Sequence, residues 1–249
     1  MPDFAAKGEW APEQAVLPYA EINGGIATIH SIRNFEYRSA RDFTPRYYDR
    51  TIPIADVVSV DFIVVPFTKW LGIAHTFVSF GIKDGTYLAV SVEARRQVGQ
   101  RYSPLKGLFG VYGLIYVIAD ERDVIYLRTN IWKSNAYLYP IRATPQKVQR
   151  LFVEMLLRAN KLKELPERYN SLTNSCTVNL VRHINTVTPK RVPLSIRMML
   201  SWSTDTLAYT LGLIDSPRPL KEIRDAHRIT GRALRAGYAA DFSNKIRGR

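Results

Sequence analysis

The first half of the chain alternates between hydrophobic and polar residues or is rich in β-branched ones, and both patterns are typical of β-strands. Strands are predicted over residues 26–39, 56–66, 74–82, 86–93, 111–119, 123–129 and 136–141. Residues 40–53 contain Pro45 and Pro53 and are predicted to form a loop. These short, closely spaced strands favour a mostly antiparallel sheet.

The strongest turn signal is the Asp84–Gly85 pair, which separates two predicted strands. Asp-Gly is strongly favoured in two-residue hairpin turns. A two-residue turn at this pair would bring His75 opposite Ala94, next to Glu93.

Beyond the last predicted strand, the hydrophobic period lengthens to that of a helix. Thr144-Pro145 suits a helix start, with proline at the first helical position. A core-facing stripe then follows, made of Val148, Leu151, Phe152, Met155 and Leu156. Residues 176–187 predict a second helix capped by Thr173 or Asn174, and residues 194–213 predict a further helical stretch. Strands followed by helices indicate an α+β fold, a mostly antiparallel sheet with packed helices.

Composition and charge narrow the class of protein. The 249 residues are 46% hydrophobic and carry a formal charge of +13, from 35 Lys and Arg against 22 Asp and Glu. Such a chain can bury a core, and its charge suits nucleic acid, an anionic lipid surface or an acidic substrate. Because no nucleic-acid-binding motif accompanies the charge, we expect no nucleic-acid partner. No uncharged apolar run approaches the ~20 residues of a transmembrane helix.

Basic residues concentrate near the C-terminus. Residues 218–249 hold nine Lys or Arg and three Asp or Glu. The four-residue spacing of Arg224, Arg228 and Arg232 would place them on one face of a helix. With Arg235, they are interpreted either as a solvated helix and tail or as a patch that binds anionic headgroups.

The single cysteine, Cys176, lies in the first turn of the predicted helix 176–187. One cysteine excludes an intrachain disulfide and a cysteine-rich zinc site, and we expect neither a metal nor a cofactor. The helix dipole and free N–H groups at this position favour a reactive thiolate, so Cys176 is a candidate nucleophile. The alternative is a small buried hydrophobic residue.

A nucleophilic thiol needs a base, and the chain has four histidines. His183 lies two turns along the same predicted helix and is not expected to reach the thiol. His75, with Glu93 beside it, would complete a set of thiol, base and orienting carboxylate. The alternatives are a hydrogen-bonded core histidine and, for Glu93, a salt bridge to one of Arg95, Arg96 and Arg128.

Several segments together resemble one bacterial family. The resemblance is carried, in order, by RNFEYRS (33–39), AHTFVSFGIKDGTYLAVSVEARR (74–96), GLFGVYGLIYVIADERDVIYLRT (107–129), YLYPI (137–141) and LPERYNSLTNSCT (165–177). These segments are similar to the periplasmic domain of Lnb-type lipoprotein N-acyltransferases, formerly a domain of unknown function. The resemblance covers roughly residues 30–180.

The resemblance implies a circularly permuted papain-like thiol enzyme, in which the histidine precedes the cysteine. It implies Cys176 as nucleophile and His75 as general base. Glu93, in the SVEAR motif, is carried over as the third member, and Ser91 on the same strand competes for that role. Supporting roles are assigned to Arg95 of the same motif and to the loop residues Tyr169, Asn170 and Asn174.

The activity that the resemblance implies is acyl transfer at a membrane. Cys176 would take an acyl chain from an ester of a diacylglyceryl lipoprotein and pass it, through a thioester, to the N-terminal amine. The expected partners are diacylglyceryl lipoproteins or phospholipid and an anionic membrane surface. The alternatives are a papain-like thiol amidase or peptidase of the cell envelope and a non-enzymatic, basic membrane or nucleic-acid binder with an inert cysteine.

Three parts are expected in the chain: an extended N-terminal segment over 1–29, a catalytic domain over 30–215, and a basic C-terminal helix and tail over 216–249. The N-terminus carries Asp3 and Glu9 and does not resemble a signal peptide. The resemblance nevertheless implies the periplasm or the outer face of the cytoplasmic membrane. We therefore expect that an anchor or signal is missing from this sequence.

Overall fold

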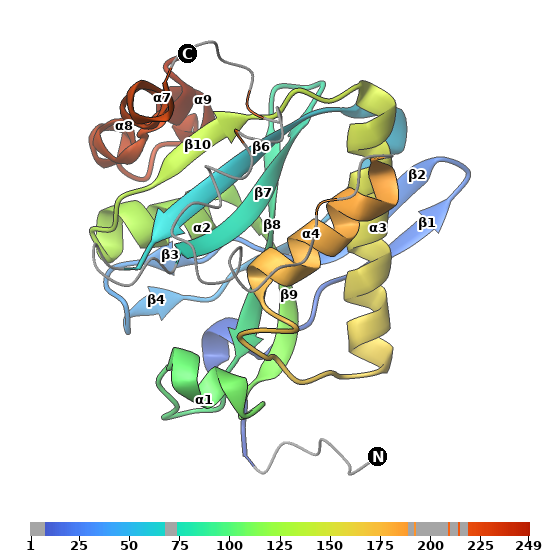
Figure 1. Cartoon of the computed structure of the whole chain (residues 1–249), viewed down its shortest axis with the longest axis vertical. Coiled ribbons are helices and arrows are strands. Elements are labelled where there is room, and N and C mark those ends of the chain that lie inside the picture. Colours follow the sequence, from blue (N-terminus) through green and yellow to red (C-terminus); the bar gives the residue numbers. More distant parts are fainter. Residues whose placement is uncertain (1–7, 68–73, 189–191, 193–208, 210–213, 215–218) are drawn as a thin grey trace.

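A computed structural model describes residues 8–67, 74–188, 192, 209, 214 and 219–249. Its centre is an eight-stranded sheet with strand order β1-β2-β9-β8-β7-β6-β10, in which β5 also pairs with β2 (Figure 1). The strands are β1 Tyr19–Asn23, β2 Ile26–Arg33, β5 Tyr47–Pro53, β6 Val57–Pro66, β7 Ala74–Ile82, β8 Tyr87–Arg95, β9 Gly113–Asp120 and β10 Tyr137–Pro140. Only β2 and β9 pair in parallel. The α+β class and the mostly antiparallel sheet are confirmed.

Helices cover both faces of the sheet. They are α1 Pro104–Leu108, α2 Glu121–Tyr126, α3 Pro145–Glu164, α4 Cys176–Val187, α7 Leu220–His227, α8 Thr230–Ala236 and α9 Phe242–Arg247. A two-stranded ribbon of β3 (Glu36–Tyr37) and β4 (Phe43–Thr44) lies beside the sheet. No helix in the described ranges is long and apolar enough to span a membrane. The helical stretch predicted over 194–213 lies outside the described residues.

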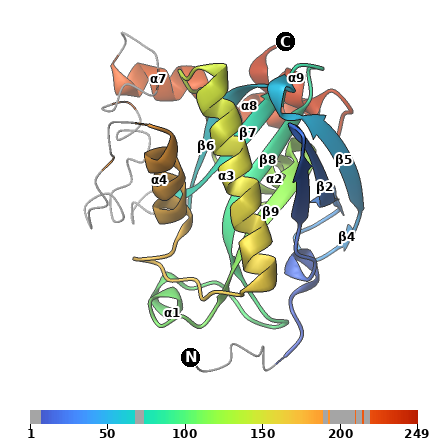
Figure 2. The ribbon, with the colours of Figure 1, turned by 90° about the vertical axis from the view of Figure 1, so that its right-hand side faces the viewer.

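Side chains alternate between two cores along β6, β7, β8, β9 and β10. One core joins Val78 and Val90 to α3 and α4, and we call this side the α3–α4 face. The other joins Phe77 and Ala89 to α2, α8 and α9, and we call it the α2–α9 face (Figure 2). Neighbouring residues of β7 therefore point to opposite faces, as a strand requires.

The prediction of a loop over residues 40–53 is wrong, because this segment contains β4 and β5. β5 pairs along β2, from Ile26 opposite Pro53 to Arg33 opposite Tyr47. Its proline closes the strand, where no further ladder hydrogen bond is needed. Most of its side chains stay partly or fully exposed, so no hydrophobic alternation marked it.

The strand predicted over 123–129 is also wrong, because the chain forms α2 and then a π-helical turn over Leu127–Ile131. The side chain of Asp120 caps α2 by accepting a hydrogen bond from the Arg122 N–H at 2.8 Å. Two acidic residues in the first turn suit the positive end of the helix. Capping and charge thus override the β-branched pattern of the segment.

The predicted hairpin is present, but its register differs by one residue. The Ile82 N–H donates to the Thr86 carbonyl, so three residues form the loop, and Gly85 takes the left-handed conformation with φ of 84°. Phe77 consequently pairs with Ser91. Continuing the ladder by two residues sets His75 opposite Glu93, on one face, and not opposite Ala94.

The C-terminal arginines do not share one helix face, and that prediction is wrong. α7 ends at His227, and Arg228 follows in extended conformation. Ile229 is fully buried and donates its N–H to the Ala136 carbonyl, which interrupts the helix. Arg232 therefore lies in a separate helix, α8, which packs onto the α2–α9 face.

Candidate active site

Cys176 is the first residue of α4, and its side chain is 8% exposed. The helix cap is Ser175, which makes no side-chain capping bond, so the prediction of Thr173 or Asn174 as cap is wrong. The first N–H groups of a helix have no intrahelical partner. The thiol thus lies beside backbone donors that are suited to an oxyanion.

The loop that precedes Cys176 is held by two asparagines. The side-chain oxygen of Asn170 accepts hydrogen bonds from the N–H groups of Leu172 and Thr173, both at 2.9 Å. Asn174 donates to the Arg168 carbonyl and accepts from the side chain of Asn179 in α4, at 2.9 Å each. These bonds hold the loop against the start of α4. The sequence analysis predicts a supporting role in this loop for both asparagines.

Two tyrosines interact electrostatically with Cys176. The hydroxyls of Tyr102 and Tyr169 lie 3.3 Å apart. Burial raises the pKa of both tyrosines, and the nearby Cys176 raises it further. Both phenols therefore remain protonated, with O–H groups near the sulfur. The sequence singled out Tyr169 but missed Tyr102, because a tyrosine in an irregular loop carries no signal of its own.

His75, Ser91 and Glu93 form one hydrogen-bonded chain. The Ser91 hydroxyl donates to Glu93 Oε1 at 2.9 Å and lies 2.8 Å from His75 Nε2. Since the hydroxyl has one proton, it accepts from His75, which assigns the proton to Nε2 and leaves Nδ1 with a lone pair. Glu93 Oε1 also accepts from Arg128 Nη2 at 2.8 Å. The ion-pair partner of Glu93 is thus Arg128.

Burial and the charge of Arg128 set the charge states of His75 and Glu93. Burial and the positive charge of Arg128 lower the pKa of His75 to about 3, against the opposing effect of Glu93. Burial alone would raise the pKa of Glu93, but Arg128 and His75 hold it below its usual range. At neutral pH the imidazole is therefore neutral and the carboxylate ionised.

His75 and Cys176 lie on adjoining elements, but their side chains lie on opposite faces of the sheet. Thr76 Oγ1 lies 3.5 Å from Thr177 Oγ1, which joins β7 to the start of α4. The His75 ring instead stacks on Phe77, with centroids 5.4 Å apart, on the α2–α9 face. Within the described residues no hydrogen bond joins the imidazole to the thiol.

Aromatic ring contacts lead from His75 toward the surroundings of Cys176 near the start of β7. The Phe67 ring lies 6.4 Å from the His75 ring and 6.1 Å from the Tyr102 ring. Tyr102 in turn is one of the two tyrosines whose pKa is raised by Cys176. Phe67 is therefore the link between the imidazole and the surroundings of the thiol.

Arg95 and His183 make structural contacts away from Cys176. The Arg95 guanidinium donates to the carbonyls of Gln14 and Ala15 and lies over the Trp10 ring, so it holds the N-terminal segment. His183 Nε2 lies 2.7 Å from the Tyr116 hydroxyl inside the core. Burial and neighbouring arginines lower the pKa of His183 to about 4. His183 is thus a buried structural histidine that faces the sheet.

An apolar groove, which the sequence did not reveal, begins one residue from Cys176. Along α4 it is lined from Thr177 to Thr188, and its opposite wall comes from β6, β7 and α3. Its lining includes Val60, Phe62, Val78, Val148, Leu151, Leu180, Val181, Ile184 and Val187. Arg142 and Lys147 are its cationic members and are exposed. Across the described ranges, no group of three or more His, Cys, Asp or Glu is arranged to hold a metal ion.

Comparison with known proteins gives one match. The family described as the Lnb N-terminal periplasmic domain matches residues 43–202, more than half of the chain. The match contains β7, β8 and the start of α4. No curated protein and no solved structure matches the chain.

Proposed function

The chain belongs to the family of Lnb N-terminal periplasmic domains, and from this premise we propose that it is a cysteine-dependent acyltransferase. It moves an O-linked acyl chain of a diacylglyceryl lipoprotein to the N-terminal amine of that lipoprotein. The observation that carries the proposal is the position of Cys176, in the first turn of α4 and one residue from an apolar groove.

In the first half of the reaction, the Cys176 sulfur attacks the ester carbonyl. The carbon–sulfur bond forms, the carbon–oxygen bond of the ester breaks, and the thiol proton passes through the base to the departing alkoxide. Negative charge that develops on the carbonyl oxygen is stabilised by the N–H groups of the α4 first turn.

In the second half, the lipoprotein amine attacks the thioester. The amide bond forms, the carbon–sulfur bond breaks, and the base returns a proton from the amine to the sulfur. The apolar walls of the groove exclude water and favour the amine over hydrolysis.

His75 serves as the base through Nδ1, because Nε2 is held by Ser91 and Glu93. To reach the thiol, the imidazole must turn around the end of β7, past Phe67. Ser91 and Glu93 orient the ring and stabilise the imidazolium that forms. This assignment makes the Ser91–Glu93 chain the third component of the site.

The groove favours an acyl substrate over a peptide. Its lining residues on α4 recur at helical spacing from Thr177, so they form one apolar stripe next to the nucleophile. A peptide backbone in this groove would leave its N–H and C=O groups without partners. The thiol amidase or peptidase alternative therefore lacks a matching surface in this groove.

The proposal is tested by intact-mass spectrometry of the protein after incubation with a diacylated lipopeptide. We expect a mass increase of one acyl chain on Cys176 that hydroxylamine removes, and an N-acylated lipopeptide as product. Cys176→Ala should show neither. Release of free fatty acid without N-acylation would show that the protein hydrolyses the ester instead of transferring the acyl chain. A protein that never gains the acyl mass would refute the proposal.

A further inference from the structure

The helix α1 projects at one end of the molecule (Figure 1). The two most exposed large apolar side chains of the described residues belong to Leu105 in α1 and to Phe109, which directly follows it. Phe109 is 78% exposed and Leu105 65% exposed. They are four residues apart and share one side of the helical segment. Such side chains contribute little to the fold, because they remain in solvent.

The backbone of α1 is held firmly although these side chains are exposed. Ser171 Oγ donates to the Pro104 carbonyl and Asn170 Nδ2 to the Leu108 carbonyl, both at 2.8 Å. The guanidinium of Arg168 donates to the Gly110 carbonyl at 2.8 Å. All three partners belong to the loop that leads to Cys176, so hydrogen bonds connect α1 to the segment that carries the thiol.

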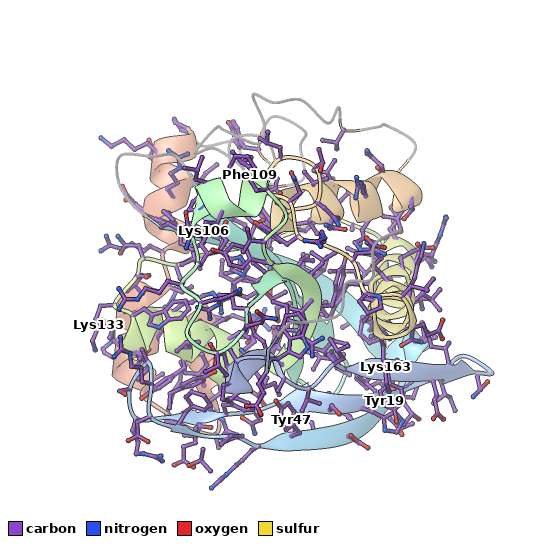
Figure 3. The ribbon with its side chains drawn as sticks, turned by 90° about the horizontal axis from the view of Figure 1, so that it is seen from below. Tyr19, Tyr47, Lys106, Phe109, Lys133 and Lys163 are labelled. Atoms are coloured by element: carbon purple, nitrogen blue, oxygen red, sulfur yellow. The ribbon has the colours of Figure 1, made fainter. Side chains whose placement is uncertain are left out.

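Basic residues accompany α1 in the sequence, and residues 94–119 contain no acidic residue. Of these basic residues, Arg95 is buried and Arg96 pairs with Glu13, which leaves Arg101 and Lys106 beside α1. Arg101 and Lys106 are exposed, and Lys106 lies next to Phe109 at this end of the molecule (Figure 3). Apolar side chains beside cations are the features of a segment that enters the headgroup region of an anionic bilayer.

We propose that α1 docks the protein onto a lipid bilayer that contains anionic lipids, with Leu105 and Phe109 entering the interface and Lys106 contacting phosphate headgroups. The docking brings the Cys176 loop to the membrane surface, where ester-linked acyl chains are found. Two projecting side chains suit insertion into lipid better than a protein interface, which typically buries about 800 Å² per partner.

This docking site differs from the C-terminal arginines considered from the sequence. Arg228 and Arg235 are exposed; Arg228 lies between α7 and α8, and Arg235 lies in α8, which packs on the α2–α9 face. Leu234 lies beside Arg235 and is 45% exposed. It is an exposed apolar side chain next to a cation, as on α1, but at a different surface. The two surfaces can therefore be compared by equivalent substitutions.

The test is co-sedimentation of the full chain with vesicles of phosphatidylcholine, with and without phosphatidylglycerol. We expect binding only with the anionic lipid. The double variant Leu105→Gln, Phe109→Gln should bind at least about tenfold more weakly, and Lys106→Gln about fivefold more weakly and with a smaller dependence on salt. Thermal unfolding should be unchanged, because the altered side chains are exposed.

Leu234→Gln and the pair Arg228→Gln, Arg235→Gln are the controls and should bind like the unmodified protein. Undiminished binding of the α1 double variant would overturn the proposal, as would a loss confined to the arginine pair. A change of oligomeric state in the α1 variant, measured by light scattering, would assign the surface to a second copy of the chain. No turnover is measured, so the result is independent of the acyl-transfer test.

Discussion

The two faces of the central sheet are built from different interactions. The α3–α4 face is packed by long helices through apolar side chains and leaves an apolar groove beside α4. The α2–α9 face buries ion pairs next to its smaller apolar core: Arg33 with Asp123, Arg128 with Glu93, and Arg247 with Asp61 and Glu121. The first face is suited to receive an apolar chain, and the second fixes an imidazole and its carboxylate.

The ion pairs of the α2–α9 face also connect segments that are distant in sequence. Asp123, fully buried in α2, accepts hydrogen bonds from the Arg33 guanidinium and from the Phe35 N–H. Arg247 reaches from the C-terminal helix to Asp61 in β6 and Glu121 in α2. Removing one member of such a group leaves an unpaired buried charge, so each is sensitive to substitution.

The largest effect is expected at Arg247, whose side chain is 7% exposed. Arg247→Met should lower the free energy of unfolding by about 3–5 kcal/mol, because Asp61 and Glu121 would remain buried without their partner. Urea unfolding measures this. The control Lys245→Met removes an exposed pair with Asp241 and should cost less than about 1 kcal/mol. Equal effects of the two variants would show that burial does not set the strength of these ion pairs.

Stability should fall with acid on account of two buried histidines. The pKa is lowered to about 3 for His75 and to about 4 for His183. Between pH 6.5 and about 4, only the unfolded chain therefore takes up these protons, and the free energy of unfolding falls as pH falls. The slope should be up to about 1.4 kcal/mol per pH unit for each histidine. His183→Gln should reduce that slope, and parallel curves for the two proteins would contradict this account.

The α3–α4 face is tested by filling its groove. Ile184→Trp places a large ring among the groove residues and should slow transfer of a long acyl chain about tenfold, while a short-chain ester still reacts. Leu157→Trp, on the exposed side of α3, is the control. An equal loss for short and long chains would show that the groove does not hold the acyl chain.

A smaller effect is expected at the polar contact between β9 and α4, within the α3–α4 face. Tyr116→Phe removes the hydroxyl that bonds His183 Nε2 and should lower the free energy of unfolding by about 1 kcal/mol. Chemical denaturation measures the change. A neutral substitution would mean that water replaces the hydroxyl at this position.

Local patterns predicted the α3–α4 face better than the α2–α9 face. The stripe from Val148 to Leu156 gave α3 directly, and the position of Cys176 marked the start of α4. By contrast, α2 was predicted as a strand, because its stability depends on the Asp120 cap and on buried partners far away in sequence. Ion pairs such as Arg247–Asp61 join residues that no local pattern relates.

The candidate site shows the same division. The pairing of His75 with Ser91 and Glu93 follows from a hairpin, yet one left-handed glycine shifted its register and changed which residue faces His75. The apolar groove and Tyr102 arise from several elements meeting in space and could not be read from spacing alone. The roles of Cys176, His75 and Glu93 in catalysis remain predictions.

The most direct test of the central claim, that His75 on one face activates Cys176 on the other, is the alkylation rate of Cys176 by iodoacetamide at neutral pH. Cys176 is the single cysteine, so the rate reports this thiol alone. We expect fast alkylation in the unmodified protein and a rate about a hundredfold lower in folded His75→Gln, with Tyr116→Phe unaffected. An unchanged rate in His75→Gln would contradict the account.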